Sequence, residues 1–207
     1  MFAHALVLAA ALLLVAPGPG KVWAGAPTDQ LRSQINRTIQ ILDDPELKKP
    51  GKSKDRRAAV RQVANDIFDF GETAKRSLAR HWAARSQAER DEFVQLFADL
   101  LERSYISKIE LYGGEKIRFV GEATDPDGAI VKTRLITKAE TEIPIDYRMH
   151  LRGDKWLVYD VTIEGVSLIN NYRTQFDRII RSSSYAELVK RLKERKPIAG
   201  PQPRAAR

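Results

Sequence analysis

Residues that could carry out acid–base or metal chemistry are few in this sequence and do not cluster. The histidines are His4, His81 and His150, and cysteine is absent, which excludes disulfides and thiolate metal sites. Asp146 and His150 lie on the same face of a predicted strand. About 13 Å of extended chain separates them, which is beyond hydrogen-bonding distance. We therefore expect neither an enzyme nor a metal or other cofactor.

Two strands and a helix are predicted close together in the C-terminal half. Apolar and polar residues alternate over 146–151, which indicates a half-buried strand. A hairpin turn follows at 152–154, where Gly153 can adopt a positive φ. Residues 156–163 are apolar on nearly both sides, which is typical of a central strand. Helical spacing then begins at about Ser167.

The rest of the chain predicts helices first and strands afterwards. Thr28 is the predicted N-cap of a first helix, and Ser86–Glu89 forms a capping box before a long helix with a broad apolar face. Alternation from Lys116 onward, with Asp-Gly and Gly-Asp turns, predicts an antiparallel meander of about four strands. The predicted class is α+β, with N-terminal helices packed on a curved sheet and closing C-terminal helices. Periodicity fits both a dry core and an apolar slot between these layers.

Several short segments, in one order, resemble the MlaC family, which is also called the toluene-tolerance family. These segments are Asp146-Tyr147-Arg148, Trp156–Val161, Glu164–Leu168 and Asn171–Phe176, together with Phe68–Phe70, Trp82 and Phe93–Tyr105 in the N-terminal half. The resemblance extends from about Leu31 to Leu192. The family consists of periplasmic phospholipid-binding proteins of Gram-negative lipid transport. Membership would imply an internal apolar pocket that takes acyl chains, with the bound lipid as cargo and its head group near the mouth.

The resemblance implies that the long helix, the sheet and the closing helix line this pocket. The expected lipid-binding residues are Phe93, Leu96, Phe97, Leu100, Tyr105, Tyr147, Met149, Tyr159, Val161, Val166, Ile169 and Tyr172. Each of these residues also fits an ordinary core position. Arg148 and Arg173 are candidates for binding the head-group phosphate, because a guanidinium matches its geometry. The alternative is that they form salt bridges with Asp146, Asp160 or Glu164.

The two ends of the chain differ in composition from the body. Residues 1–26 are the predicted signal peptide, although Met1–His4 lacks a basic residue, so a retained N-terminal anchor is the alternative. Residues 27–195 are the predicted lipid-binding domain, and 196–207 a disordered basic tail. Seven basic residues and one acidic residue lie in Lys190–Arg207, which accounts for most of the formal charge of +8. The nearly neutral body argues against nucleic acid as a partner. The tail either approaches anionic head groups or only keeps the protein soluble.

The expected function is that of a monomeric periplasmic lipid carrier that serves outer-membrane lipid asymmetry. The resemblance implies two partners, an ATP-driven lipid transporter at the inner membrane and a lipoprotein complex at the outer membrane. The sequence lacks a phosphate-binding G-x-x-x-x-G-K-[ST] loop, so the carrier itself would not power transport. Two alternatives stay open. The family has a branch associated with hopanoid biosynthesis, which would carry a rigid polycyclic lipid, and a periplasmic adaptor would bind protein in its apolar groove.

Overall fold

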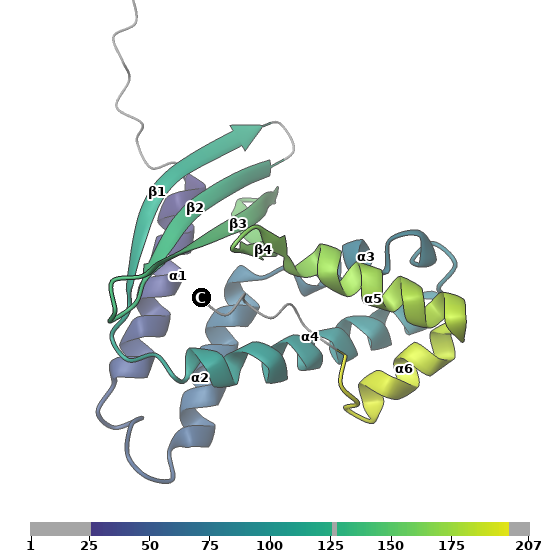
Figure 1. The fold of residues 1–207 in the computed structure, drawn as a ribbon, viewed down its shortest axis with the longest axis horizontal. Coiled ribbons are helices and arrows are strands. Elements are labelled where there is room, and N and C mark those ends of the chain that lie inside the picture. Colours follow the sequence, from purple (N-terminus) through teal and green to yellow (C-terminus); the bar gives the residue numbers. More distant parts are fainter. Residues whose placement is uncertain (1–25, 126–127, 199–207) are drawn as a thin grey trace, which may run out of the picture.

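A computed structural model describes residues 26–125 and 128–198 of the chain (Figure 1). Its helices are α1 (Ala26–Asp43), α2 (Ser53–Ile67), α3 (Phe70–Leu78), a 3-10 turn η1 (Ala79–His81), α4 (Gln87–Ile109), α5 (Leu168–Ser182) and α6 (Tyr185–Lys193). Its strands are β1 (Lys116–Asp125), β2 (Gly128–Ile136), β3 (Glu142–Arg152), β4 (Lys155–Ile163) and β5 (Val166–Ser167). This order confirms the predicted α+β class. In the part of the chain described, no helix combines the length and the apolar character that crossing a membrane requires.

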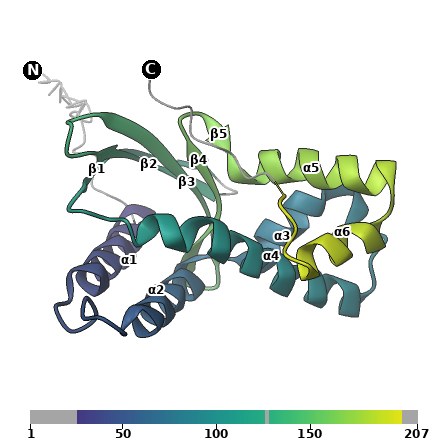
Figure 2. The same ribbon diagram turned by 60° about the horizontal axis from the view of Figure 1, so that its bottom comes forward.

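The sheet is an antiparallel meander in the order β1-β2-β3-β4-β5. It contains the predicted four strands and adds the two-residue β5. Gly153 lies in the β3–β4 turn with a φ of +64°, as its place in the predicted hairpin requires. Register shifts between Phe119 and Gly121 and between Arg148 and Met149 mark bulges. Bulges increase local twist and bend a strand, which agrees with the curved sheet in Figure 2.

Helix α4 links two parts of the molecule. Its first turn carries the predicted capping box, in which Ser86 accepts from the Glu89 backbone N–H and the Glu89 carboxylate accepts from the Ser86 N–H. From there α4 passes along α3 and α6, and its later turns contact α2 (Figures 1 and 2). The helix therefore lies partly in a bundle of helices and partly in front of the sheet.

The buried apolar residues form three separate clusters. The helical cluster joins α3, α4, α5 and α6 around Phe93, Phe97 and Phe176. The sheet cluster joins the inner face of β2–β4 to Leu31 of α1 and Ile67 of α2. A third and smaller cluster joins Leu42, Val60 and Ile106, where α1, α2 and α4 meet. The buried apolar residues thus form three groups, and α4 contributes to the helical cluster and to the smallest one.

The start of α1 differs from the prediction. The helix begins at Ala26, so Thr28 is not an N-cap but a buried residue of the first turn. Its backbone N–H and its hydroxyl both donate to Oε2 of Glu122, the N–H over 2.9 Å. A carboxylate near a helix N-terminus also favours the helix dipole. The sequence pattern missed this contact because Glu122 lies 94 positions away.

We expect Glu122→Ala to lower the free energy of unfolding by about 2 kcal/mol, because it leaves two donors of α1 without their charged acceptor. Urea unfolding of the purified protein measures the change. Glu46→Ala is the matched control, since Glu46 pairs with Lys49 on the surface and should change stability by less than about 0.5 kcal/mol. Equal effects of the two substitutions would show that Glu122 does not hold α1.

Packed structure continues beyond the predicted end of the domain. Ile198 is 8% exposed and packs in the helical cluster, whereas Lys196 and Pro197 are exposed. The rest of the predicted basic tail and residues 1–25 of the predicted signal peptide lie outside the described residues.

Candidate functional site

One end of the inner sheet face is fully buried, whereas the other end is only half-buried. Ala129, Val131, Met149 and Val158 are at most 4% exposed, and they pack against Leu31 and other members of the sheet cluster. Toward the opposite end, the large apolar residues of the same face keep part of their surface. These half-buried residues are Ile117, Phe119, Leu135, Ile143, Ile145 and Ile163. They are neighbours across the strands, with Leu135 opposite Ile143 and Ile145 opposite Ile163. We call them the apolar wall.

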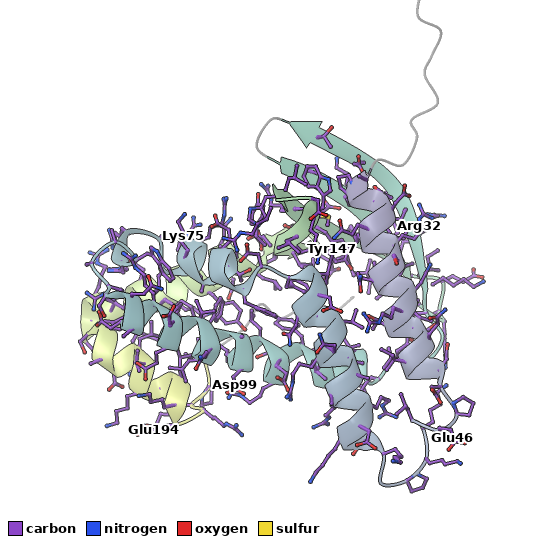
Figure 3. The ribbon with its side chains drawn as sticks, turned by 180° about the vertical axis from the view of Figure 1, so that it is seen from behind. Arg32, Glu46, Lys75, Asp99, Tyr147 and Glu194 are labelled. Carbon is purple, nitrogen blue, oxygen red and sulfur yellow. The ribbon has the colours of Figure 1, made fainter. Side chains whose placement is uncertain are left out.

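Tyr147 lies at the border between the covered part of the sheet and the apolar wall. It pairs with Val131 on β2 and Val161 on β4, and it packs against the sheet cluster. Figure 3 shows its label among the side chains between the sheet and the helices α1 and α2. Burial raises the pKa of the Tyr147 phenol to about 12. The residue is nevertheless only half-buried and keeps part of its surface accessible.

The raised pKa of Tyr147 predicts a loss of stability at high pH. The folded protein holds this proton more tightly than the unfolded chain does. The protonated Tyr147 phenol therefore makes its full contribution to the free energy of unfolding below pH 10. This contribution is lost as the pH rises from about 10 to about 12. Tyr147→Phe should reduce this alkaline loss by on the order of 2 kcal/mol, and ultraviolet titration should show one late-ionising phenol fewer. Loss of a phenol that ionises near pH 10, with the late-ionising part of the curve unchanged, would mean that the Tyr147 hydroxyl is in contact with bulk water.

Tyr105 lies on the later turns of α4. Tyr105 is half-buried, and the Lys108 Nζ lies 5.6 Å from the centroid of its ring. Burial, and then the neighbouring Tyr172, raise the pKa of Tyr105 above the ordinary tyrosine value. Tyr172 of α5 is fully buried in the helical cluster. The two tyrosines are therefore neighbours that join α4 to α5.

The other residues expected on α4 and α5 are enclosed in the helical cluster. Phe97 lies between Tyr172 and Phe176, with ring centroids 5.1 and 5.2 Å away, and Phe93 contacts Phe176 at 5.6 Å. Leu100 is 5% exposed, and Leu96 packs half-buried against the same cluster. These contacts already occupy their side chains.

The residues expected from the sheet fall in different places. Met149 and Val161 are buried in the sheet cluster, and Ile169 is buried at the start of α5. Val166 is 41% exposed on β5. Tyr159 is at the β4 bulge and contacts His150 and the Arg76 guanidinium, with ring-to-ring and cation-to-ring distances of 5.6 and 4.2 Å. It thus lies on the outer face, away from Tyr147.

Both arginines proposed for the head group are exposed. Arg148 points to the outer face of β3, opposite Asp160, and Arg173 donates from Nε to the Arg76 carbonyl over 3.0 Å. Neither forms an ion pair within the described residues. Asp160 instead accepts from the Ser167 hydroxyl and the Ile169 N–H, which fixes the start of α5.

The residues of the apolar wall are not among the predicted lipid-binding residues, although the alternation of apolar and polar residues along the strands indicates their face. Ile143 and Ile145 continue the alternation that singled out Tyr147 and Met149, and Ile163 lies on the same face of the next strand. Alternation identifies the face of a residue, but not whether a helix covers it. The predicted lipid-binding residues were chosen largely for their aromatic side chains, and half of these aromatic residues lie in the packed helical cluster.

The two histidines in the described part of the chain stabilise the fold. His150 Nε2 lies 3.0 Å from Asp69 Oδ2, and Asp69 also accepts from Arg152 and from the Glu72 N–H at the start of α3. His81 pairs with Asp177 at 2.8 Å. Asp69 thereby fixes α3 to β3 across 81 positions of sequence, a contact that spacing did not reveal. Within the described residues, no three metal-ligating side chains gather in one place.

Surface hollows near the C-terminal helices do not match the expected pocket. One, of about 460 Å³, is lined by Thr174, Asp177, Arg178, Arg181 and Ser182 on α5. Another, of about 480 Å³, lies between α4 and α6 and is lined mainly by charged residues such as Glu89, Glu92 and Lys193. Both are open to solvent and carry charges, which suits water better than an acyl chain.

Known proteins resemble this chain in both sequence and structure. A phospholipid-binding protein from Ralstonia solanacearum, solved in complex with a phospholipid, has the same fold, with a TM-score of 0.73 and 22% identity over 83% of this chain and 97% of that one. The intermembrane phospholipid transport system binding protein MlaC of Haemophilus influenzae is 22% identical over 140 residues. That match covers 64% of this chain and just under two thirds, 65%, of the relative.

The family comparison gives the assignment. The MlaC protein family matches residues 32–194, which extend from the second turn of α1 to the end of α6. The match agrees with the segments on which the resemblance was first noted. This chain therefore belongs to the MlaC family.

Proposed function

We propose that this protein is a periplasmic carrier that binds the acyl chains of a phospholipid between the apolar wall and the later turns of α4. In this proposal, Tyr147 and Tyr105 are the predicted lipid-binding residues that border the space between the sheet and α4. Ile143, Ile145 and Ile163 extend its surface along the sheet. The fully buried residues of the helical cluster, Phe93 and Phe97 among them, hold α4 in place behind it.

The row of half-buried apolar residues beside Tyr147 is the observation that carries the proposal. Leu135, Ile143, Ile145 and Ile163 lie on the inner sheet face and keep part of their surface, whereas Val131, Met149 and Val158 on the same face are fully buried. Tyr147 lies between these two groups, and burial raises the pKa of its phenol. A partly uncovered surface of leucine and isoleucine is suited to hydrocarbon.

The energetics of acyl-chain burial fit a carrier. Each methylene removed from water contributes about 0.8 kcal/mol, so two chains with roughly 30 methylenes gain on the order of 20 kcal/mol. A bilayer offers nearly the same gain. Exchange between bilayer and protein is then close to balanced, whereas release into water is strongly unfavourable. Direction would therefore come from partner complexes.

The relatives support phospholipid as the cargo and two membranes as the places of exchange. The Ralstonia protein of the same fold binds a phospholipid, and the Haemophilus relative is the binding protein of an intermembrane phospholipid transport system. We propose that this chain exchanges lipid with an ATP-driven transporter at the inner membrane and a lipoprotein complex at the outer membrane. Arg148 and Arg173 were the predicted head-group contacts, but Arg148 points to the outer face of β3 and Arg173 lies against α3. We propose Lys108, beside Tyr105, as the cation nearer to the acyl-chain site.

The proposal is tested by extracting the purified full-length protein with organic solvent and identifying the extract by mass spectrometry. We expect about one phospholipid per protein. A polycyclic lipid in its place would change the cargo to the hopanoid type. An extract without lipid would favour a protein-binding adaptor, and lyso-lipid with free fatty acid after incubation with phospholipid would indicate a hydrolase.

A further inference from the structure

Basic side chains gather on one side of the helical part of the protein. They belong to α3, the turn η1 and α5, and the helices α3 and α5 are adjacent in both Figure 1 and Figure 2. The acidic residues of these elements are Glu72 and Asp177, and both are half-buried. We call this surface the cationic face. Its six exposed basic residues are Lys75, Arg76, Arg80, Arg173, Arg178 and Arg181.

Hydrogen bonds between α5 and the segment of α3 and η1 hold the cationic face together. Asp177 of α5 accepts from the Arg80 guanidinium, and its Oδ1 lies 2.8 Å from His81 Nε2. Arg173 donates from Nε to the Arg76 carbonyl over 3.0 Å. The two helices therefore present their basic residues side by side, as one surface.

Part of the cationic face is a hollow that is open to solvent. This hollow, of about 460 Å³, runs along α5, and the guanidinium groups of Arg178 and Arg181 share its lining with the hydroxyls of Thr174 and Ser182. Arg181 lies 4.0 Å from Asp177, and Arg178 forms no ion pair within the described residues. A guanidinium matches the geometry of a phosphate, and hydroxyl groups can add hydrogen bonds to it. The hollow is therefore suited to a phosphate-bearing head group.

Helix α4 has the opposite balance of charge. Its five acidic residues outnumber its three basic ones, which are Arg90, Arg103 and Lys108. In Figure 2, α5 and α4 lie on different sides of the helical part. Positive charge is thus concentrated toward α3 and α5, and this uneven distribution would turn the cationic face toward a negatively charged surface.

The composition of the cationic face fits a lipid surface better than a protein partner. Protein interfaces have an apolar centre, often with aromatic residues, whereas charge alone attracts a basic surface to anionic lipids. No exposed large apolar side chain in the part of the chain described belongs to α3, η1 or α5. Those that are exposed are Ile109, Leu111, Val120, Leu151 and Val166.

We infer that the cationic face docks the protein on the surface of bilayers that contain anionic phospholipids. The choice of a membrane as the partner rests on the proposed function, while the charges and the hollow are features of the structure. Docking adds a step that the proposed function leaves open, because it would hold the carrier at a bilayer during lipid exchange.

Sedimentation of the purified full-length protein with vesicles tests this inference. We expect binding to vesicles of phosphatidylcholine mixed with phosphatidylglycerol, but not to phosphatidylcholine alone, and loss of binding at high salt. Arg178→Glu combined with Arg181→Glu should weaken binding by about 25-fold or more, since each basic residue near an anionic surface contributes about five-fold. Lys48→Glu combined with Lys54→Glu is the matched control. It makes the same change of net charge at exposed positions around the start of α2, and should alter binding by less than about two-fold.

Each outcome separates docking from lipid carriage. Equal binding to the two kinds of vesicle, or equal losses in the two double variants, would overturn docking through the cationic face. Unchanged binding of the Arg178 and Arg181 variant would also overturn it. This variant should keep its co-purified phospholipid, whereas vesicle binding by an unmodified protein that carries no lipid would support docking and overturn the proposed function. If the glutamate variant fails to fold, Arg178→Gln with Arg181→Gln should show a loss of about 25-fold.

Discussion

Tyr105→Glu should reduce the amount of phospholipid that the protein retains by about 30-fold. Tyr105 is half-buried on α4 and borders the space proposed for the acyl chains. A carboxylate there would either stay charged against hydrocarbon or take up a proton. Either state weakens binding by about 2 kcal/mol or more. Co-purified lipid per protein, quantified by mass spectrometry, measures the effect.

Leu111→Glu is the control for this prediction. Leu111 is 80% exposed just beyond the end of α4, so the same charge at this position should leave lipid retention unchanged. Circular dichroism should show that both variants keep the helical content of the unmodified protein. Normal retention in a folded Tyr105→Glu protein would remove Tyr105 from the binding site and would place the acyl chains elsewhere.

Phe97→Ala should destabilise the lipid-free protein by about 4 kcal/mol and lower its melting temperature by about 10 °C. Phe97 is 1% exposed and forms edge-to-face contacts with the rings of Tyr172 and Phe176. Its removal leaves a cavity that the surrounding rings cannot fill. Urea and thermal unfolding of the lipid-free protein provide the measurement.

This variant also distinguishes a supporting residue from a lining residue. A lining role predicts that Phe97→Ala loses lipid while the stability of the lipid-free protein changes little. A supporting role predicts that Phe97→Ala mainly lowers the stability of the lipid-free protein, while the folded variant still binds lipid. Leu111→Ala serves as the exposed control and should change stability by less than about 0.5 kcal/mol.

Local chemistry explains which parts of the fold could be predicted from the sequence. The capping box at Ser86 and the turn at Gly153 depend on residues a few positions apart, and both have the predicted form. The start of α1 depends on Glu122, and the position of α3 on the pairing of Asp69 with His150. Contacts between distant positions leave no local pattern, so these features could not be found.

The candidate site was predictable only in outline. Alternation identified the inner sheet face, and helical spacing identified the buried side of α4. Whether a residue on that face is covered depends on where α1 and α4 cross the sheet, which is a tertiary property. Met149 and Tyr147 follow the same pattern, yet Met149 is 0% exposed whereas Tyr147 keeps accessible surface.

The position of the acyl chains can be measured with a phospholipid that carries a photoreactive group at the end of one chain. After loading and illumination, peptide mass spectrometry locates the cross-linked residues. We expect cross-links in β3 around Ile143–Tyr147, in β4 near Ile163 and on the later turns of α4. Cross-links confined to the outer sheet face around Tyr159, or to the surface of α5 and α6, would contradict the proposal that lipid lies between the sheet and α4.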